Sequence, residues 1–222
     1  MIEIHTARLA LSIDESQLTS FNGVYEAQAR DRLAEIWTVE AIDLPHYHAL
    51  FIDKNIDETF DFFSFVTIAY IDHGYVIDPQ EAIDIVEAKK QIEIDLEIIN
   101  REARWGAEES IFFDDWWPRP AYQADKQMLE FGIALKDFYQ KVINRTLNRI
   151  ILTRNGHIAV NYSLSEDDLY SDKTLAYFQG KLDEICQAIK IHEGYRYQDV
   201  DEEKDYPSKS RMINLILSSE IF

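Results

Sequence analysis

The chain has 222 residues and carries 41 Asp and Glu against 22 Lys and Arg, which gives a formal net charge of −19 at pH 7. Hydrophobic residues make up 46% of the chain, which is too much for an intrinsically disordered protein, although the net charge alone would allow one. Only 7 Gly and 5 Pro are present, which excludes collagen-like and low-complexity sequence. We therefore expect one globular domain over residues 1–222.

The negative charge also excludes two classes of partner. Direct nucleic-acid binding needs positive charge to displace counterions from phosphates, and membrane leaflets are themselves anionic. The longest apolar run without charge, residues 62–71, has ten residues, whereas a spanning helix needs about 20. The N-terminus lacks the basic start of a secretory signal, and the single cysteine, Cys186, cannot form an internal disulfide. We expect a cytoplasmic protein that contacts neither nucleic acid nor membrane.

The first third of the chain predicts strands and a core element. Apolar and polar residues alternate from Ala7 to Ile13, which is the period of a half-buried strand. Residues 46–52 follow a proline and suit a second short strand. Residues 57–70 are apolar nearly all round, which is typical of a buried element of either type.

Residues 79–104 predict one long helix. Asp78 can cap it, Pro79 suits the first helical position, and apolar residues then recur at helical spacing as far as Ala103. Residues 91–99, however, also alternate apolar and acidic side chains, as a strand with one acidic face would. We favour the helix because no turn residue divides the segment, and the strand stays open as an alternative.

The remaining elements follow in order. Residues 106–120 predict a loop because of their two prolines, and residues 121–147 predict a helix from apolar residues at helical spacing. Residues 150–162 predict a hairpin around an Asn-Gly dipeptide, the strongest short-range turn signal in the chain. Residues 172–192 predict another helix, and residues 211–222 predict a helix or strand that docks on the core.

Together these elements predict an α+β fold. We expect a helix-dominated single domain with a small antiparallel sheet, built from the N-terminal strand and the hairpin at 150–162. Neither an internal repeat nor a linker divides the chain.

Charge is unevenly distributed along the sequence. Residues 40–115 carry 19 acidic and 5 basic residues, a net charge of −14, whereas residues 116–163 carry 3 acidic and 7 basic residues, a net charge of +4. Charge runs usually face water, so a solvated surface is the simpler interpretation. The alternative is an acidic binding face.

Two acids stand directly before two indoles at residues 114–117. Carboxylates beside indole rings suit a cation or an arginine-bearing partner, whereas the simpler alternative is an aromatic plug that holds the loop on the core. Acidic residues of the 79–104 element join this face if they are exposed. The candidate binding residues are Glu93, Asp95, Glu97, Asp114, Asp115, Trp116 and Trp117.

Motifs for catalysis or cofactor binding are weak. His46 and His48 lie on one side of a possible strand, about 7 Å apart, and nearby carboxylates offer oxygen ligands for a metal. The chain has no H-E-x-x-H, C-x-x-C, phosphate-binding loop or nucleophile elbow. We expect no cofactor and no metal, with a site at His46 and His48 as the weaker alternative, and we interpret Cys186 as a core residue with an unreactive thiol.

The functional hypothesis is an acidic cytoplasmic binding or inhibitor protein with a basic protein partner. An immunity protein that neutralises a basic toxin or a nucleic-acid-binding enzyme would fit, because a negative face speeds association with a cationic target. Two alternatives stay open. One is a metal-dependent or hydrolytic enzyme that uses His46, His48 and nearby carboxylates, and the other is an assembly subunit.

Overall fold

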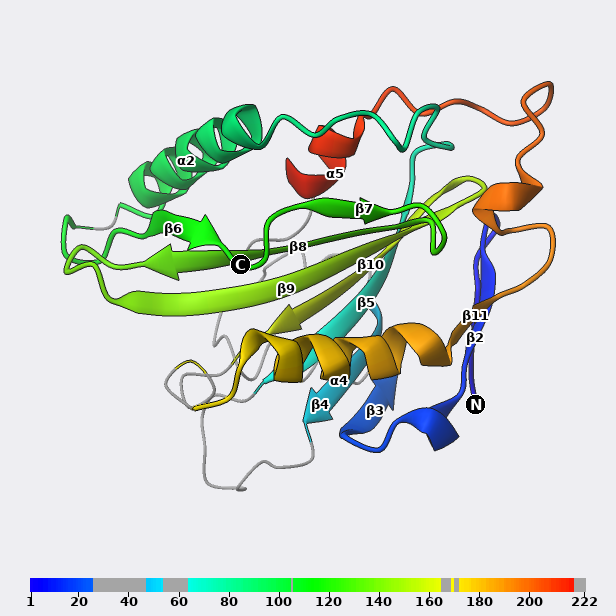
Figure 1. Ribbon diagram of the computed structural model, residues 1–222, viewed down its shortest axis with the longest axis horizontal. Coiled ribbons are helices and arrows are strands. Elements are labelled where there is room, and N and C mark those ends of the chain that lie inside the picture. The colour runs from blue at the N-terminus through cyan, green and yellow to red at the C-terminus, as the bar shows by residue number, and fades with distance from the viewer. Residues whose placement is uncertain (26–46, 54–63, 105, 165–168, 170–171, 218–222) are drawn as a thin grey trace.

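The computed structural model describes residues 1–25, 47–53, 64–104, 106–164, 169 and 172–217 (Figure 1). In chain order the described elements are β1 (Ile2–His5), β2 (Ala10–Ile13), the 3-10 helix η1 (Glu15–Gln17), β3 (Phe21–Tyr25), β4 (Tyr47–Asp53), β5 (Phe65–Asp72), α2 (Ile85–Glu102), β6 (Phe112–Trp116), β7 (Ala121–Gln123), β8 (Met128–Lys136), β9 (Val142–Thr153), β10 (Gly156–Ser163), α4 (Leu175–Ala188), β11 (Ile189–Ile191), the 3-10 helix η2 (Tyr197–Asp199) and α5 (Met212–Leu217).

A large antiparallel sheet organises these elements. It has eight strands in the order β3-β4-β5-β10-β9-β8-β6, with β7 also paired to β8. A second sheet of three strands has the order β1-β2-β11. None of the helices in the described part of the chain is both long and apolar enough to span a bilayer.

The predicted helix-dominated α+β fold is therefore wrong, because the described structure is dominated by strands. The two parts of the predicted small sheet also separate. β2, from the N-terminal strand, lies in the three-stranded sheet, whereas β9 and β10 lie in the middle of the large one. The hairpin itself is present, with Arg154 and Asn155 as its two turn residues.

The largest error concerns residues 121–147, which form β7, β8 and part of β9 instead of a helix. Leu129, Phe131 and Ile133 all pack into the core on one face of the sheet, yet Met128, Gly132 and Ala134 at the alternate positions are also buried. A strand covered on both faces has no polar side, so its alternation disappears and apolar spacing no longer distinguishes it from a helix.

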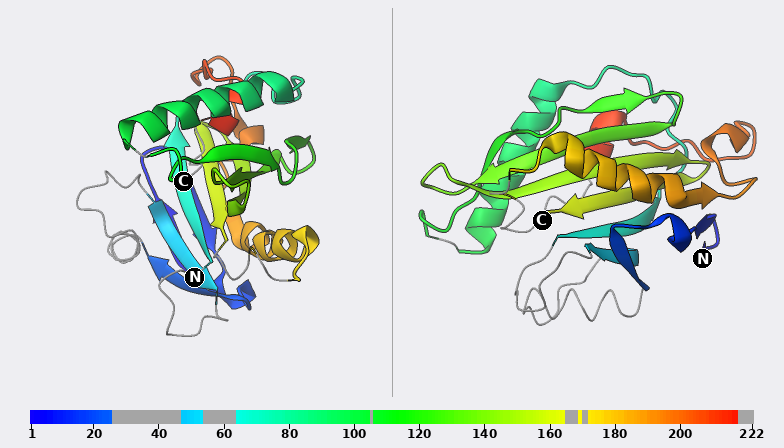
Figure 2. Two further views of the ribbon diagram at one scale, coloured as in Figure 1. Left: turned by 90° about the vertical axis from the view of Figure 1, so that its left-hand side faces the viewer. Right: turned by 60° about the horizontal axis from the view of Figure 1, so that its bottom comes forward.

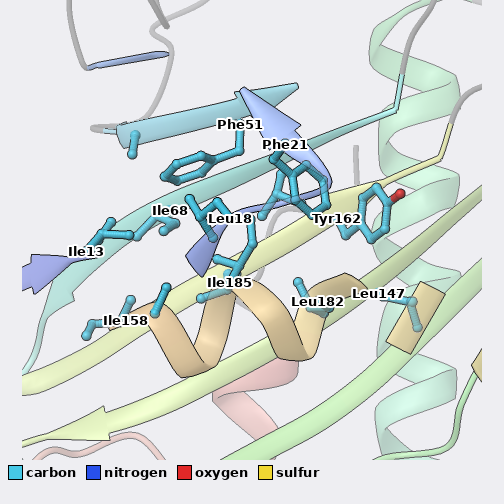
Figure 3. Close-up of a cluster of buried hydrophobic side chains, with 14 of the residues drawn as sticks. Ile13, Leu18, Phe21, Phe51, Ile68, Leu147, Ile158, Tyr162, Leu182 and Ile185 are labelled. Carbon is cyan, nitrogen blue, oxygen red and sulfur yellow. The ribbon is translucent and has the colours of Figure 1, made fainter. Parts of the chain in front are cut away.

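Each face of the large sheet is covered by its own apolar layer. On one face α4 packs with the three-stranded sheet, and Figure 3 shows Leu182 and Ile185 of α4 beside Phe21, Phe51 and Tyr162. On the other face α2 and α5 pack against β6, β8 and β9. Figures 1 and 2 show α4 and α2 on different sides of the sheet. The sheet is thus the middle layer of three.

Helix α2 begins later than predicted. Asp84 is its N-cap, and its carboxylate accepts hydrogen bonds from the backbone N–H groups of Val86 and Glu87. Asp78 instead closes a local turn, in which its side chain accepts from the N–H of Gln80. The helix passes through residues 91–99 without interruption, so the strand alternative for this segment is excluded.

Candidate functional site

A groove of about 480 Å³ opens between α2 and β6. It takes acidic side chains from α2, aromatic side chains from β6, and further side chains from the connection between β8 and β9. The lining residues are Glu93, Leu96, Glu97, Asn100, Ile111, Phe112, Phe113, Lys136, Phe138 and Gln140. In Figure 1 this region lies where α2 passes over β6.

Asn100, near the end of α2, binds to the chain that enters β6. Its Nδ2 donates to the carbonyl oxygen of Ile111 at 2.8 Å, and its Oδ1 accepts from the Ile111 N–H at 3.0 Å. This paired contact uses both ends of the carboxamide, as a strand neighbour would. The last turns of α2 are therefore fastened to the chain entering β6, and the groove is preformed.

The floor of the groove is apolar and well packed. Leu96 and Phe113 are buried, with 2% and 5% of their surface exposed. The Phe113 ring packs edge-to-face on Trp116, with ring centroids 5.4 Å apart. A β-bulge at Asp114 adds one residue to β6 against β8, which brings Phe113 and Trp116 to the same face although they are three residues apart.

The walls carry carboxylates that are only partly neutralised. Glu93 and Glu97 lie one turn apart on α2 and are both exposed. Glu93 is 3.7 Å from the Nζ of Lys89, whereas Glu97 has no ion-pair partner among the residues that the structure describes. On the opposite side Lys136 is already paired with Asp114, at 3.5 Å.

Exposed aromatic side chains border the same groove. Phe112 and Phe138 line it, and 38% and 49% of their surface is exposed. Tyr139, 66% exposed, contacts Phe138 edge-to-face with ring centroids 5.5 Å apart. Exposed apolar surface rimmed by polar residues is typical of a protein-interaction site. We call the groove, with Phe112, Phe138 and Tyr139 at its rim, the acidic aromatic groove.

The structure brings together only part of the predicted binding residues. Glu93 and Glu97 line the acidic aromatic groove, and Asp114 lies at its edge beside Lys136. Asp95 lies on the other flank of α2, where it accepts a hydrogen bond from Gln91 at 3.0 Å.

Asp115 and the two indoles do not form a common surface with the acids. The Asp115 carboxylate accepts a hydrogen bond from the N–H of Trp116 at 2.8 Å. Trp116 is buried in the core under α2 and α5, as in the aromatic-plug alternative. Trp117 faces the α4 side, 5.9 Å from Phe178, with the Arg145 guanidinium 5.0 Å above its ring. β6 ends at Trp116, and Trp117 in the following bend turns to the opposite side of the sheet, which separates the indoles.

The alternative metal site is only partly described. His46 lies outside the described residues, whereas His48 lies on β4. Within the described part of the chain, no group of three or more His, Cys, Asp or Glu side chains has the arrangement of a metal site.

A polar cluster that the sequence did not indicate joins His73, His157 and Ser208. His73 Nε2 lies 2.6 Å from His157 Nδ1, and His73 Nδ1 lies 2.7 Å from Ser208 Oγ. Burial lowers the pKa of His157 to about 3 and also lowers the pKa of His73. A histidine beside a serine is a nucleophile–base arrangement, but Ser208 is only 6% exposed. Because 84 and 135 residues separate the partners, no sequence spacing reveals the cluster.

A second cavity, of about 250 Å³, lies beside Cys186 and the buried Arg149. The guanidinium of Arg149 donates hydrogen bonds to the carboxylates of Glu130 and Asp183. Burial raises the pKa of the Cys186 thiol to about 11. The cavity therefore presents a protonated thiol and an arginine that is already paired, so the acidic aromatic groove is the better candidate for a binding site.

Comparison with known proteins identifies a family. A family model described as "Protein of unknown function (DUF2167)" matches residues 2–221, so the chain belongs to this family. No curated protein matches the chain. Among solved structures, the chain is similar to the solution structure of cyanobacterial PsbP (CyanoP) from Synechocystis sp. PCC 6803, with 11% sequence identity and a TM-score of 0.42 over 85% of this chain and 95% of that one.

Proposed function

We propose that this member of the DUF2167 family is a binding protein that takes a basic segment of a protein partner into the acidic aromatic groove. One observation carries the proposal. Partly neutralised carboxylates on α2 and exposed aromatic side chains line the same preformed groove. Neither feature alone would distinguish a binding site from ordinary surface.

The carboxylates favour a cationic occupant. Glu93 and Glu97 stand on a rigid helix, and Lys136 on the opposite wall is neutralised by Asp114. A negative wall in a chain with a net charge of −19 attracts positively charged partners over several ångströms and accelerates their association. This part of the interaction weakens as salt is added.

The aromatic side chains supply the short-range part of the affinity. Phe112 and Phe138 expose large apolar surface beside the charged wall, and interfaces concentrate binding energy in such aromatic anchors. An occupant that fits both features has basic side chains interspersed with apolar ones. A surface made to hold phosphates is rich in basic side chains, so the finer form of the proposal is an inhibitor or immunity protein that covers such a surface on a toxin or nucleic-acid-binding enzyme.

The experiment measures binding of a fluorescein-labelled peptide of alternating arginine and leucine by fluorescence anisotropy. The test variant is Glu93→Lys with Glu97→Lys. The matched control is Asp95→Lys with Glu102→Lys, which changes the net charge equally on the other flank of α2. We expect the test variant to lose about tenfold in affinity, equivalent to ~1.4 kcal/mol, and the control to lose much less.

Two outcomes contradict the proposal. Absence of peptide binding by the unmodified protein would remove the basis for a basic partner. An equal loss in both double variants would show that the peptide responds to net charge and not to the groove. A peptide of alternating glutamate and leucine must not bind.

A further inference from the structure

A cation of α2 lies against two of the side chains that line the acidic aromatic groove. The Nζ of Lys89, one turn before Glu93 on α2, lies 5.3 Å from the centroid of the Phe113 ring. The same ammonium lies 3.7 Å from Oε1 of Glu93. Both groups that it contacts line the groove, although Lys89 itself comes from outside the lining. An aromatic ring and a carboxylate at this end of the groove thus contact the same ammonium group.

We infer that Lys89 is an internal competitor, which occupies in the free protein the place that an arginine side chain of the partner takes in the complex. This role of Lys89 rests on the proposed function. The groove recognises the guanidinium group of the partner, and Lys89 limits the affinity for it.

The geometry favours a guanidinium over an ammonium as the incoming group. An aromatic ring beside a carboxylate forms a site for a cation, and arginine stacks on rings more readily than lysine. Glu97 stands one turn beyond Glu93 and has no ion-pair partner within the described residues. A planar guanidinium presents several N–H donors at once, so it can bond to two carboxylates. The ammonium of Lys89 pairs with only one of these two carboxylates, that of Glu93.

Lys89 can leave its place at little cost. Its side chain is 47% exposed and that of Glu93 is 49% exposed, and ion pairs so open to water are weak. The ammonium needs only a change of rotamer to reach solvent, since its aliphatic stem stays on α2. Lys136 differs, because its side chain is only 23% exposed and is paired with Asp114. Lys89, and not Lys136, is therefore the cation that the partner displaces.

The experiment uses the full chain and the same arginine–leucine peptide, together with a lysine–leucine peptide of equal length. Lys89→Met removes the ammonium and keeps an unbranched side chain of similar reach. Lys90→Met is the matched control, since Lys90 makes the same contribution to net charge but contacts neither Phe113 nor Glu93. Circular dichroism confirms that α2 is intact in both variants.

We expect Lys89→Met to bind the arginine peptide about three- to tenfold more tightly than Lys90→Met does. We also expect Lys89→Arg to bind no more tightly than the unmodified protein, and the arginine peptide to bind more tightly than the lysine peptide. Equal affinities of Lys89→Met and Lys90→Met would overturn the inference and leave the proposed function intact. Failure of every protein to bind would overturn both, whereas binding by Lys89→Met alone would support the competitor.

Discussion

Two charged regions on opposite faces of the large sheet differ in how completely their groups are paired. Under α4, Arg149 has a side chain only 3% exposed and is enclosed by Glu130 and Asp183. Under α2, Glu93 is about half exposed and weakly paired, and Glu97 has no ion-pair partner in the described structure. Charges under α4 therefore hold the fold together, whereas charges under α2 are available to a partner.

The largest effect on stability is expected from removal of the buried Arg149. Arg149→Ala leaves the nearly buried Glu130 without its counter-ion, so the free energy of unfolding should fall by about 3–5 kcal/mol. Glu93→Ala, on the exposed face of α2, should change the free energy of unfolding by less than about 0.5 kcal/mol. Urea unfolding followed by circular dichroism measures both values. Similar losses in the two variants would show that the regions do not differ in this way.

A fall in pH tests the buried cluster of His73, His157 and Ser208, which lies on the same face of the large sheet as the groove. Burial lowers the pKa of His157 to about 3, whereas an unfolded histidine titrates near 6.5. The unfolded state therefore takes up the proton first, and the stability contributed by neutral His157 is complete above pH 6.5 and is lost as the pH falls towards 3.

The measurement compares urea unfolding of the unmodified protein and His157→Gln across this pH range. The unmodified protein should lose stability more steeply than the variant between pH 6.5 and 4. Should both proteins show the same pH dependence, His157 would not be the group responsible.

The smallest effect is expected from an exposed aromatic side chain at the groove. Phe138→Ala should leave the free energy of unfolding nearly unchanged, because half of the side chain is already exposed. It should weaken binding of the arginine–leucine peptide by about 1–2 kcal/mol, mainly through faster dissociation. Tyr206→Ala is the control, since Tyr206 is 74% exposed and does not line the groove. Stopped-flow fluorescence separates the two rates, and equal effects of the two variants would contradict an anchoring role.

Local sequence patterns predicted the elements that have one polar side. Helix α2 buries Ala88, Ile92 and Leu96 and exposes acidic residues, so its amphipathic pattern survives in the sequence. Helix α4 is recognisable for the same reason, and the turn of the β9–β10 hairpin is marked by its residue types. Gly156 has a further role, since a Cβ there would lie 2.0 Å from the carbonyl oxygen of Ile71 on β5.

The candidate site was predictable only in part. The helical pattern of α2 puts Glu93 and Glu97 one turn apart, whereas the sequence-based prediction grouped them with Asp95, which lies on the other flank of the helix. The structure separates the two indoles from the acids, because Trp116 packs into the core under α2 and α5 whereas Trp117 lies on the α4 side. Phe112 and Phe138 were not selected, since their position beside α2 depends on strand register.

Residue types along the chain account for the net charge and for the acidic character of residues 40–115, and the apolar period of α2 accounts for the helical face that carries Glu93 and Glu97. These depend on residue types and on contacts between neighbours along the chain. Packing between separate segments makes strands of residues 121–123, 128–136 and 142–147 in place of the predicted helix, fastens Asn100 of α2 to Ile111, and brings His73, His157 and Ser208 together. Each of these depends on groups that are distant in the sequence or on a strand covered on both faces, where local periodicity carries no information about the partner.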